Sequence, residues 1–119
     1  MNTNRLMENL KRMETLSSGD IFDRSVCLDN LSFMLILFEM VFNERHATNK
    51  WCIHAIIHIF YNLSDPSYRN VCMAIFESDA KIVFSSYLRL STKASPDSME
   101  GLSREYVRQI LDTLSKPLS

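Results

Sequence analysis

The residues that could carry chemistry gather in one short stretch, residues 51–64, which reads WCIHAIIHIFYNLS. His54 and His58 are four residues apart, so both would face one side of a helix, as a zinc site requires. In zinc proteases a glutamate follows the first histidine directly, and here Ala55 stands in that position. No second histidine–carboxylate pair is spaced to complete a tetrahedral site. We therefore expect packing or groove-lining histidines, with no metal and no cofactor.

Other catalytic patterns have no positive support in the sequence. A glycine-rich phosphate loop cannot be assembled from Gly19 and Gly101, the two glycines of the chain. Residue counts alone leave a Ser-His-Asp triad open, but no serine lies in a nucleophile-elbow context. We therefore expect the protein not to be an enzyme.

Composition narrows the class of protein further. With 119 residues, 46% of them hydrophobic, the chain is long enough for one globular domain, residues 1–119. Only 2 glycines and 3 prolines favour helices over a β protein rich in turns. Thirteen basic and fourteen acidic residues give no electrostatic footprint for nucleic acid or an anionic membrane. Three cysteines without a CxxC pair, and a start that lacks an apolar signal-peptide core, predict an intracellular protein in the cytoplasm or nucleus.

Apolar periodicity predicts an all-α chain. Segment 28–43 is apolar on nearly all sides, which is typical of a helix buried between two neighbours. Segment 81–90 is short enough that its pattern also permits a strand. Asp65-Pro66 should end the helix 50–64, with Pro66 in the first turn of the next helix. The helices expected, with 20–27 left as a short helix or a turn, cover 4–16, 20–27, 28–43, 50–64, 66–78, 79–92 and 102–115.

Capping residues and core positions follow from the same pattern. Ser18 or Asp20 could cap the segment that starts near residue 20, and Ser103 is expected to cap the last helix. Glu105 and Arg108 can pair along that helix. The large side chains expected in the core are Met34, Phe38, Met73, Phe76 and Phe84, together with the apolar set of segment 79–92, which is Ile82, Val83, Tyr87, Leu88 and Leu90.

A leucine-serine helix end followed by a break occurs three times, as ETLSSGD, YNLSDPS and DTLSKPL. The leucines Leu16, Leu63 and Leu114 are separated by 47 and then 51 residues. Each follows an amphipathic helix, and the first two precede a short helix and a longer apolar one. A period of this length with three helices per unit is that of armadillo and HEAT arrays.

From Ala55 to Leu90 the chain resembles the armadillo repeat family. Asn62-Leu63-Ser64 matches the family's signature at the end of its third helix, although His58 stands where a tryptophan is usual and Ser78-Asp79 where a glycine is usual. The resemblance implies a short, right-handed armadillo/HEAT-like solenoid of about two repeats. Its parts would be an N-terminal helix 4–16, a first repeat 20–64 and a second repeat 66–116.

The resemblance also implies a binding site, because the third helices of the family line a concave groove. An asparagine amide there can bond both the N–H and the C=O of an extended peptide. Asn62 could instead cap its helix and brace the next unit, and the sequence leaves both readings open. The predicted groove residues are Lys11, Thr15, His58, Asn62, Gln109 and Thr113, flanked by His54, Glu105 and Arg108.

Trp51 is a further candidate for partner binding, since tryptophan is enriched in interface hot spots. Packing against the helix 28–43 is the favoured reading of this residue.

We therefore expect a non-enzymatic scaffold or adaptor that binds a peptide segment of another protein or a second copy of itself. The chain could also be an excised part of a longer solenoid, because about two repeats are few for a stable array. Two alternatives stay open. One is a compact helical-bundle regulator, viral or Bcl-2-like, that is built around a central helix 28–43 and has a hydrophobic groove for a partner helix. The other is a nucleic-acid-binding helical repeat, which the near-zero net charge disfavours.

Overall fold

A computed structural model describes residues 3–44, 50–91 and 95–116, and these ranges fold into seven α-helices without a strand. The all-α prediction is confirmed. Segment 81–90 is helical, and the short segment after residue 20 is a helix rather than a turn. The helices are α1 (Thr3–Leu16), α2 (Ile21–Leu28), α3 (Leu31–Glu44), α4 (Lys50–Leu63), α5 (Arg69–Glu77), α6 (Ala80–Leu90) and α7 (Met99–Ser115).

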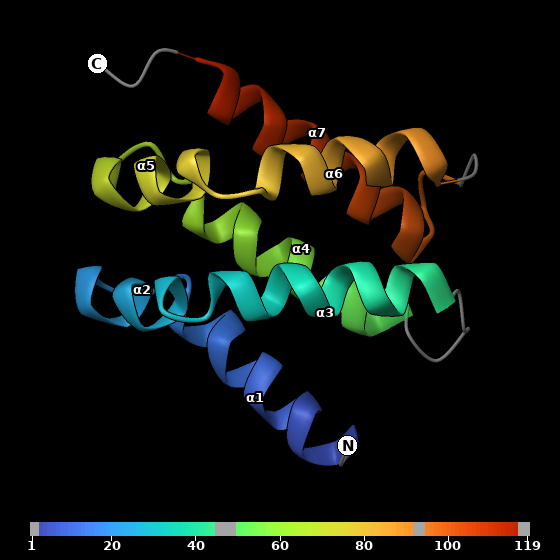
Figure 1. The fold of residues 1–119 in the computed structure, drawn as a ribbon, viewed down its shortest axis with the longest axis horizontal. Coiled ribbons are helices and arrows are strands. Elements are labelled where there is room, and N and C mark those ends of the chain that lie inside the picture. The colour runs from blue at the N-terminus through green and yellow to red at the C-terminus, as the bar shows by residue number, and fades with distance from the viewer. Residues whose placement is uncertain (1–2, 45–49, 92–94, 117–119) are drawn as a thin grey trace.

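The helices form two layers (Figure 1). In the front layer α2 and α3 follow one another in a row, and α5 and α6 form a second row beside it, with α2 against α5 and α3 against α6. In the back layer α4 lies between α1 and α7 and contacts both. Because α4 also contacts α3 and α5, it connects the two layers.

The core is centred on α4 and not on segment 28–43, which the bundle alternative placed at the centre. Ile56, Ile57, Ile59, Phe60 and Leu63 of α4 are fully buried. They are buried because α1, α3, α5 and α7 all contact α4 and together cover it on several sides.

Segment 28–43 differs from its prediction in two ways. Its helix, α3, begins only at Leu31, and the chain bends by 56° between α2, which ends at Leu28, and α3. Its burial is also one-sided, because the side chains of Phe33, Ile36 and Met40 are exposed, that of Ile36 by 61%. No single helix in the described residues is long and apolar enough to cross a membrane, although α2 and α3 taken together as a bent pair reach that length and composition.

Three further apolar residues predicted in the core are exposed. Ile82 is 70% exposed and Leu90 is also exposed, because α6 turns three other predicted core residues, Val83, Phe84 and Tyr87, inward. Phe76 of α5 lies outside the core as well. Met73 is half-buried, and Met34, Phe38 and Phe84 are buried as predicted.

The helix starts are partly as predicted. Asp20 caps α2 by accepting a hydrogen bond from the backbone N–H of Asp23. Pro66 does not begin the next helix, because the side chain of Asp65 accepts the N–H of Ser67 and holds residues 65–68 in a turn before α5. The start of α7 also differs from its prediction.

The last helix starts earlier than predicted. Ser98, not Ser103, caps α7 by accepting the N–H of Gly101, and Ser103 lies buried inside the helix. A Cβ atom at Gly101 would stand 3.1 Å from the Cα of Pro96, closer than nearly all real contacts of this kind. Glycine at this position therefore lets the backbone before the helix pack against its first turn.

Candidate peptide-binding face of α1, α4 and α7

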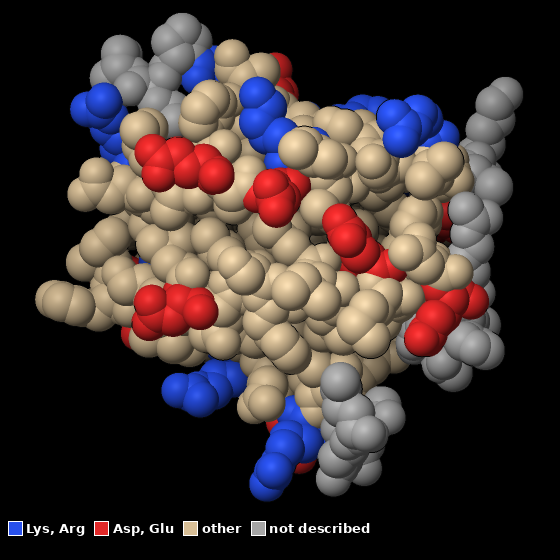
Figure 2. All heavy atoms as spheres, in the orientation of Figure 1, with Lys and Arg blue, Asp and Glu red and all other residues tan. Residues whose placement is uncertain are grey.

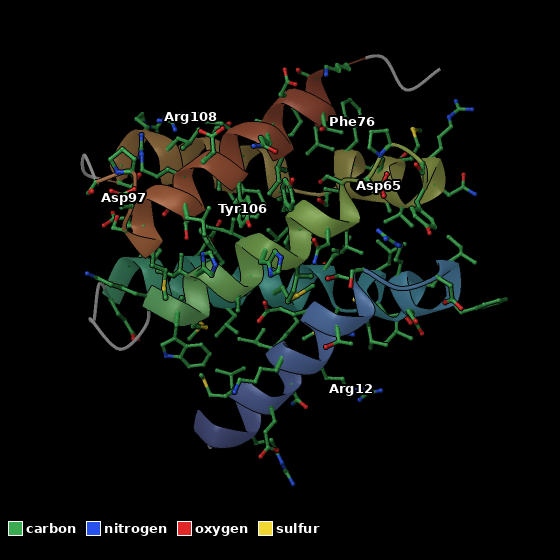
Figure 3. All side chains as sticks on the ribbon, turned by 180° about the vertical axis from the view of Figure 1, so that it is seen from behind. Arg12, Asp65, Phe76, Asp97, Tyr106 and Arg108 are labelled. Atoms are coloured by element: carbon green, nitrogen blue, oxygen red, sulfur yellow. The ribbon has the colours of Figure 1, made fainter. Side chains whose placement is uncertain are left out.

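The predicted groove residues lie on three helices of the back layer, which Figure 3 shows from behind. Lys11 and Thr15 are exposed on α1, where the hydroxyl of Thr15 donates to the carbonyl of Lys11 in its own helix. The structure joins His54, His58, Asn62, Gln109 and Thr113 into two groups. One group surrounds Tyr106, and the other lines a cleft at the C-terminal ends of α4 and α7.

The first group is a stack of rings between α4 and α7. The ring of Tyr106 lies 4.4 Å from that of Tyr61, 5.6 Å from that of His58 and 6.0 Å from that of His54, centroid to centroid, and is close to parallel with each. Aromatic contacts of this kind stabilise the packing beyond the area they bury. The stack holds both predicted histidines against α7.

Both histidines also make polar contacts to neighbouring helices. Nδ1 of His58 lies 2.8 Å from a carboxylate oxygen of Glu14 on α1. Nδ1 of His54 lies 2.8 Å from the hydroxyl of the buried Ser103 on α7. Burial lowers the pKa of His54 below its ordinary value, because the charged imidazolium loses its hydration.

In the part of the chain that the structure describes, these two histidines are not grouped with a third possible metal ligand. Among the described residues, no three side chains of histidine, cysteine, aspartate or glutamate are grouped so that they could hold a metal ion. Cys52 is buried, and burial raises the pKa of its thiol, so its thiolate form is disfavoured.

Asn62 braces the back layer. Its Nδ2 donates to the hydroxyl of Ser17 at the end of α1, over 3.0 Å, and its backbone oxygen accepts from Nη1 of Arg24, over 2.8 Å. Asn62 thus braces α4 against the ends of α1 and α2, whereas the bracing reading expected contacts to the next unit. These contacts do not use Oδ1 of Asn62, which leaves an acceptor for a ligand.

The cleft beside Asn62 has a volume of about 410 Å³ and both polar and apolar walls. It brings together Asn62, Gln109 and Thr113, three predicted groove residues that come from two different helices. The cleft is lined by Ser18, Arg24, Tyr61, Asn62, Ser64, Asp65, Pro66, Gln109, Ile110 and Thr113.

Two of the three predicted flanking residues, Glu105 and Arg108, lie around a second hollow of about 380 Å³ near the start of α7. Glu105 and Arg108 pair across 3.4 Å as the sequence predicts, and Nε2 of Gln109 donates to Glu105 over 3.4 Å. Both charged side chains are about half exposed, so this pair contributes little to stability. Trp51 is half-buried in the first turn of α4 and belongs to neither group.

Arg24 is the main cleft residue that the sequence analysis missed. Its side chain is 5% exposed, and its guanidinium lies 3.9 Å from the centre of the Tyr68 ring. Nε donates to the carbonyl of Gly19, and Nη1 to that of Asn62, each over 2.8 Å. A positive charge thus neutralises the C-terminal ends of α1 and α4. One signal in the sequence pointed to burial of Arg24: it lies three residues before Cys27, and both residues lie on the buried side of α2.

Tyr106, Tyr61, Glu14 and Ser17 were also missed. The signal for Glu14 was its place on the same predicted helix as Lys11 and Thr15, but partners on another helix could not be assigned without the packing. Comparison with family models, curated proteins and solved structures finds no match for this chain.

Proposed function

We propose that this protein is a non-enzymatic interaction module, a short solenoid of the armadillo type, that binds an extended peptide segment of a partner protein across α1, α4 and α7. The observation that carries the proposal is the cleft, where Asn62 of α4 meets Gln109 and Thr113 of α7. These positions are the ones that the repeat resemblance assigns to the groove in successive units.

The arrangement of helices supports this assignment. The three helices that end in the leucine-serine signature are α1, α4 and α7, and they are neighbours in one layer. The helices that precede them in each unit also pair, α2 with α5 and α3 with α6. Units that stack in this way bury a continuous core between repeats and leave one face of third helices open.

The cleft has the chemistry that an extended peptide requires. Such a peptide presents alternating N–H and C=O groups, which need both acceptors and donors. Oδ1 of Asn62 can accept, and the side-chain amide of Gln109 and the hydroxyl of Thr113 can each accept and donate. The ring of Tyr61 adds apolar surface for a peptide side chain.

The test uses a random peptide library displayed on phage and selected against the whole domain. Selected peptides should bind and should shift the backbone amide NMR signals of residues around the cleft. The double variant Gln109→Ala/Thr113→Ala should weaken binding at least about tenfold, the usual effect of removing central interface contacts. Within the described residues, the side chains of Gln109 and Thr113 make no hydrogen bond to another helix, so the fold should be unaffected. Asn62→Ala would also break the bond to Ser17.

The matched control is Asp112→Ala, which changes an exposed residue of α7 that pairs with Lys116 and does not line the cleft. It should leave peptide binding unchanged. The proposal is wrong if no selected peptide binds, if the NMR shifts map to α3 and α6, or if the double variant binds like the control.

Self-association is the other form of the interaction that the repeat arrangement supports. α1 and α7 each pack against α4 as the neighbouring helix of their layer, and their outer sides can receive the same kind of helix from a second copy. Light scattering across a dilution series tests it. A mass that falls with dilution is expected for a reversible dimer, and a constant monomer mass would reject it.

A further inference from the structure

The front layer carries a second surface that the peptide proposal does not use. Several large apolar side chains are exposed along α2 and α3, and that of Phe22 is exposed by 78%. Single exposed apolar residues are ordinary, but a contiguous group marks an interaction surface. The group consists of Ile21, Phe22, Val26, Phe33, Ile36 and Met40.

These side chains have helical spacing. Phe33, Ile36 and Met40 follow one another by three and four residues, so they form one ridge on α3. The opposite side of the same helix packs into the core through Met34, Phe38 and Val41. α3 has 14 residues, so the ridge belongs to a helix about 21 Å long. A ridge of this kind fits the groove between the side chains of another helix.

Within residues 20–44 the charged side chains that are not buried are all acidic. Between residues 20 and 44 the only basic residue is Arg24, which is buried and bonded to carbonyls. Figure 2 shows this side of the molecule, where uncharged side chains cover the middle, carboxylates are scattered among them, and lysines and arginines lie toward the upper and lower margins. The carboxylates of this stretch are Asp20, Asp23, Asp29, Glu39 and Glu44.

The adjoining row also exposes apolar side chains. They are those of Phe76 on α5 and Ile82 on α6, and α6 is in contact with α3. The ammonium of Lys81 lies 5.0 Å from the centre of the Phe76 ring. At that distance it is held by the ring face and covers apolar surface.

We infer that the face of α2 and α3 docks an amphipathic helix of a partner protein, with an apolar stripe between flanking lysines or arginines. The apolar stripe would cover Phe33, Ile36 and Met40, and the basic flanks would face the carboxylates. Charge complementarity selects this occupant over a second copy of the chain, because a symmetric dimer would place the same carboxylates opposite one another. It also disfavours an anionic membrane surface.

The test uses synthetic helical peptides of about 18 residues, long enough to span α3. One peptide has a leucine stripe with lysine flanks. The second keeps the leucines and has glutamate in place of lysine, and the third is a scramble of the first that has no stripe. The lysine peptide should bind at least about tenfold more tightly than either, and its affinity should fall as salt is added, because the flanking charges are screened.

Variants of the protein locate the site. Ile36→Ser/Met40→Ser should weaken binding of the lysine peptide at least about tenfold, and both side chains are exposed, so the fold should be kept. The matched control is Met99→Ser/Leu102→Ser, which removes two exposed apolar residues of α7. Glu39→Lys should reduce affinity for the lysine peptide and raise it for the glutamate peptide.

Equal affinity for the lysine and glutamate peptides would overturn the inference, as would equal binding by the Ile36/Met40 variant and its control. A dimer that Ile36→Ser/Met40→Ser dissociates would also overturn it and assign the face to a second copy. The peptide proposal fails separately, because its variants at Gln109 and Thr113 lie on the other layer and should leave this binding intact.

Discussion

Nδ1 of His58 on α4 lies 2.8 Å from a carboxylate oxygen of Glu14 on α1, and both side chains are about one-third exposed. One helical turn further on, the amide of Asn62 donates to the hydroxyl of Ser17. These two polar contacts follow the same seam between the helices. Beneath them Leu10 and Met13 of α1 are buried. The seam between α1 and α4 is therefore held by buried apolar side chains inside and by paired polar side chains at its edge.

The contact between Glu14 and His58 should show a small coupling energy. A double-mutant cycle with Glu14→Gln and His58→Gln should give about 0.2–1 kcal/mol, the range for partly exposed pairs. Urea unfolding of the unchanged protein, the two single variants and the double variant measures it. A coupling of zero would show that the two side chains do not interact in solution.

Stability should fall in mild acid partly because of His54. Burial lowers its pKa in the folded protein, the nearby His58 lowers it further, and Glu14 raises it. The unfolded chain then takes up a proton at a higher pH than the folded protein does. The contribution of neutral His54 is complete above about pH 6.5 and is lost as the pH falls through the lower pKa of the folded state.

The variant His54→Gln removes this titration and can still bond to Ser103. Its free energy of unfolding, measured in urea between about pH 5 and pH 7, should therefore depend less on pH than that of the unchanged protein. Identical slopes for the two proteins would contradict the assignment to His54.

Arg24 should not tolerate lysine. Nε of Arg24 donates to the carbonyl of Gly19 and Nη1 donates to that of Asn62. A single ammonium group cannot reproduce these two hydrogen bonds, because they point in different directions. Arg24→Lys should lower the free energy of unfolding by about 1–3 kcal/mol, because a buried acceptor loses its donor. Arg12→Lys, at an exposed position of α1, is the control and should have little effect. Equal stability of the two variants would mean that the carbonyls find other donors.

The sequence predicted the helices well because their signals are local. The three leucine-serine ends and Asp20 as a cap depend on residues within one or two turns, and the helices end close to where these signals lie. Ser103 was assigned wrongly because Ser98, five residues earlier, is also able to cap, and only the packing of residues 95 and 96 against Gly101 shows which start is used.

Burial was predicted less well for the apolar residues. Segment 28–43 is apolar on nearly all sides and was predicted to lie buried between two neighbouring helices, but the side of α3 with Phe33 and Ile36 is exposed. An apolar side chain favours burial, but whether it is buried depends on whether a neighbouring helix covers it. The cleft was predicted only in part, since Arg24 and Tyr61 reach it through contacts between helices far apart in sequence.

Phe38 and Phe33 lie on opposite sides of α3, and their variants should differ widely in stability. Phe38 is buried at the centre of a ring cluster, 5.4 Å from Phe84 and 5.6 Å from Tyr87, and so joins α3 to α6. Phe38→Ala should lower the free energy of unfolding by about 3–5 kcal/mol, the range for emptying an aromatic core position. Phe33→Ala should cost less than about 1 kcal/mol because that ring is half exposed.

Urea unfolding of the two variants beside the unchanged protein makes the comparison, and the steepness of the transition should stay the same in all three. If Phe33→Ala were as destabilising as Phe38→Ala, the ring of Phe33 would be buried in solution. The exposed ridge of α3, on which docking of a basic helix depends, would then be absent, because Ile36 and Met40 lie on the same side of the helix.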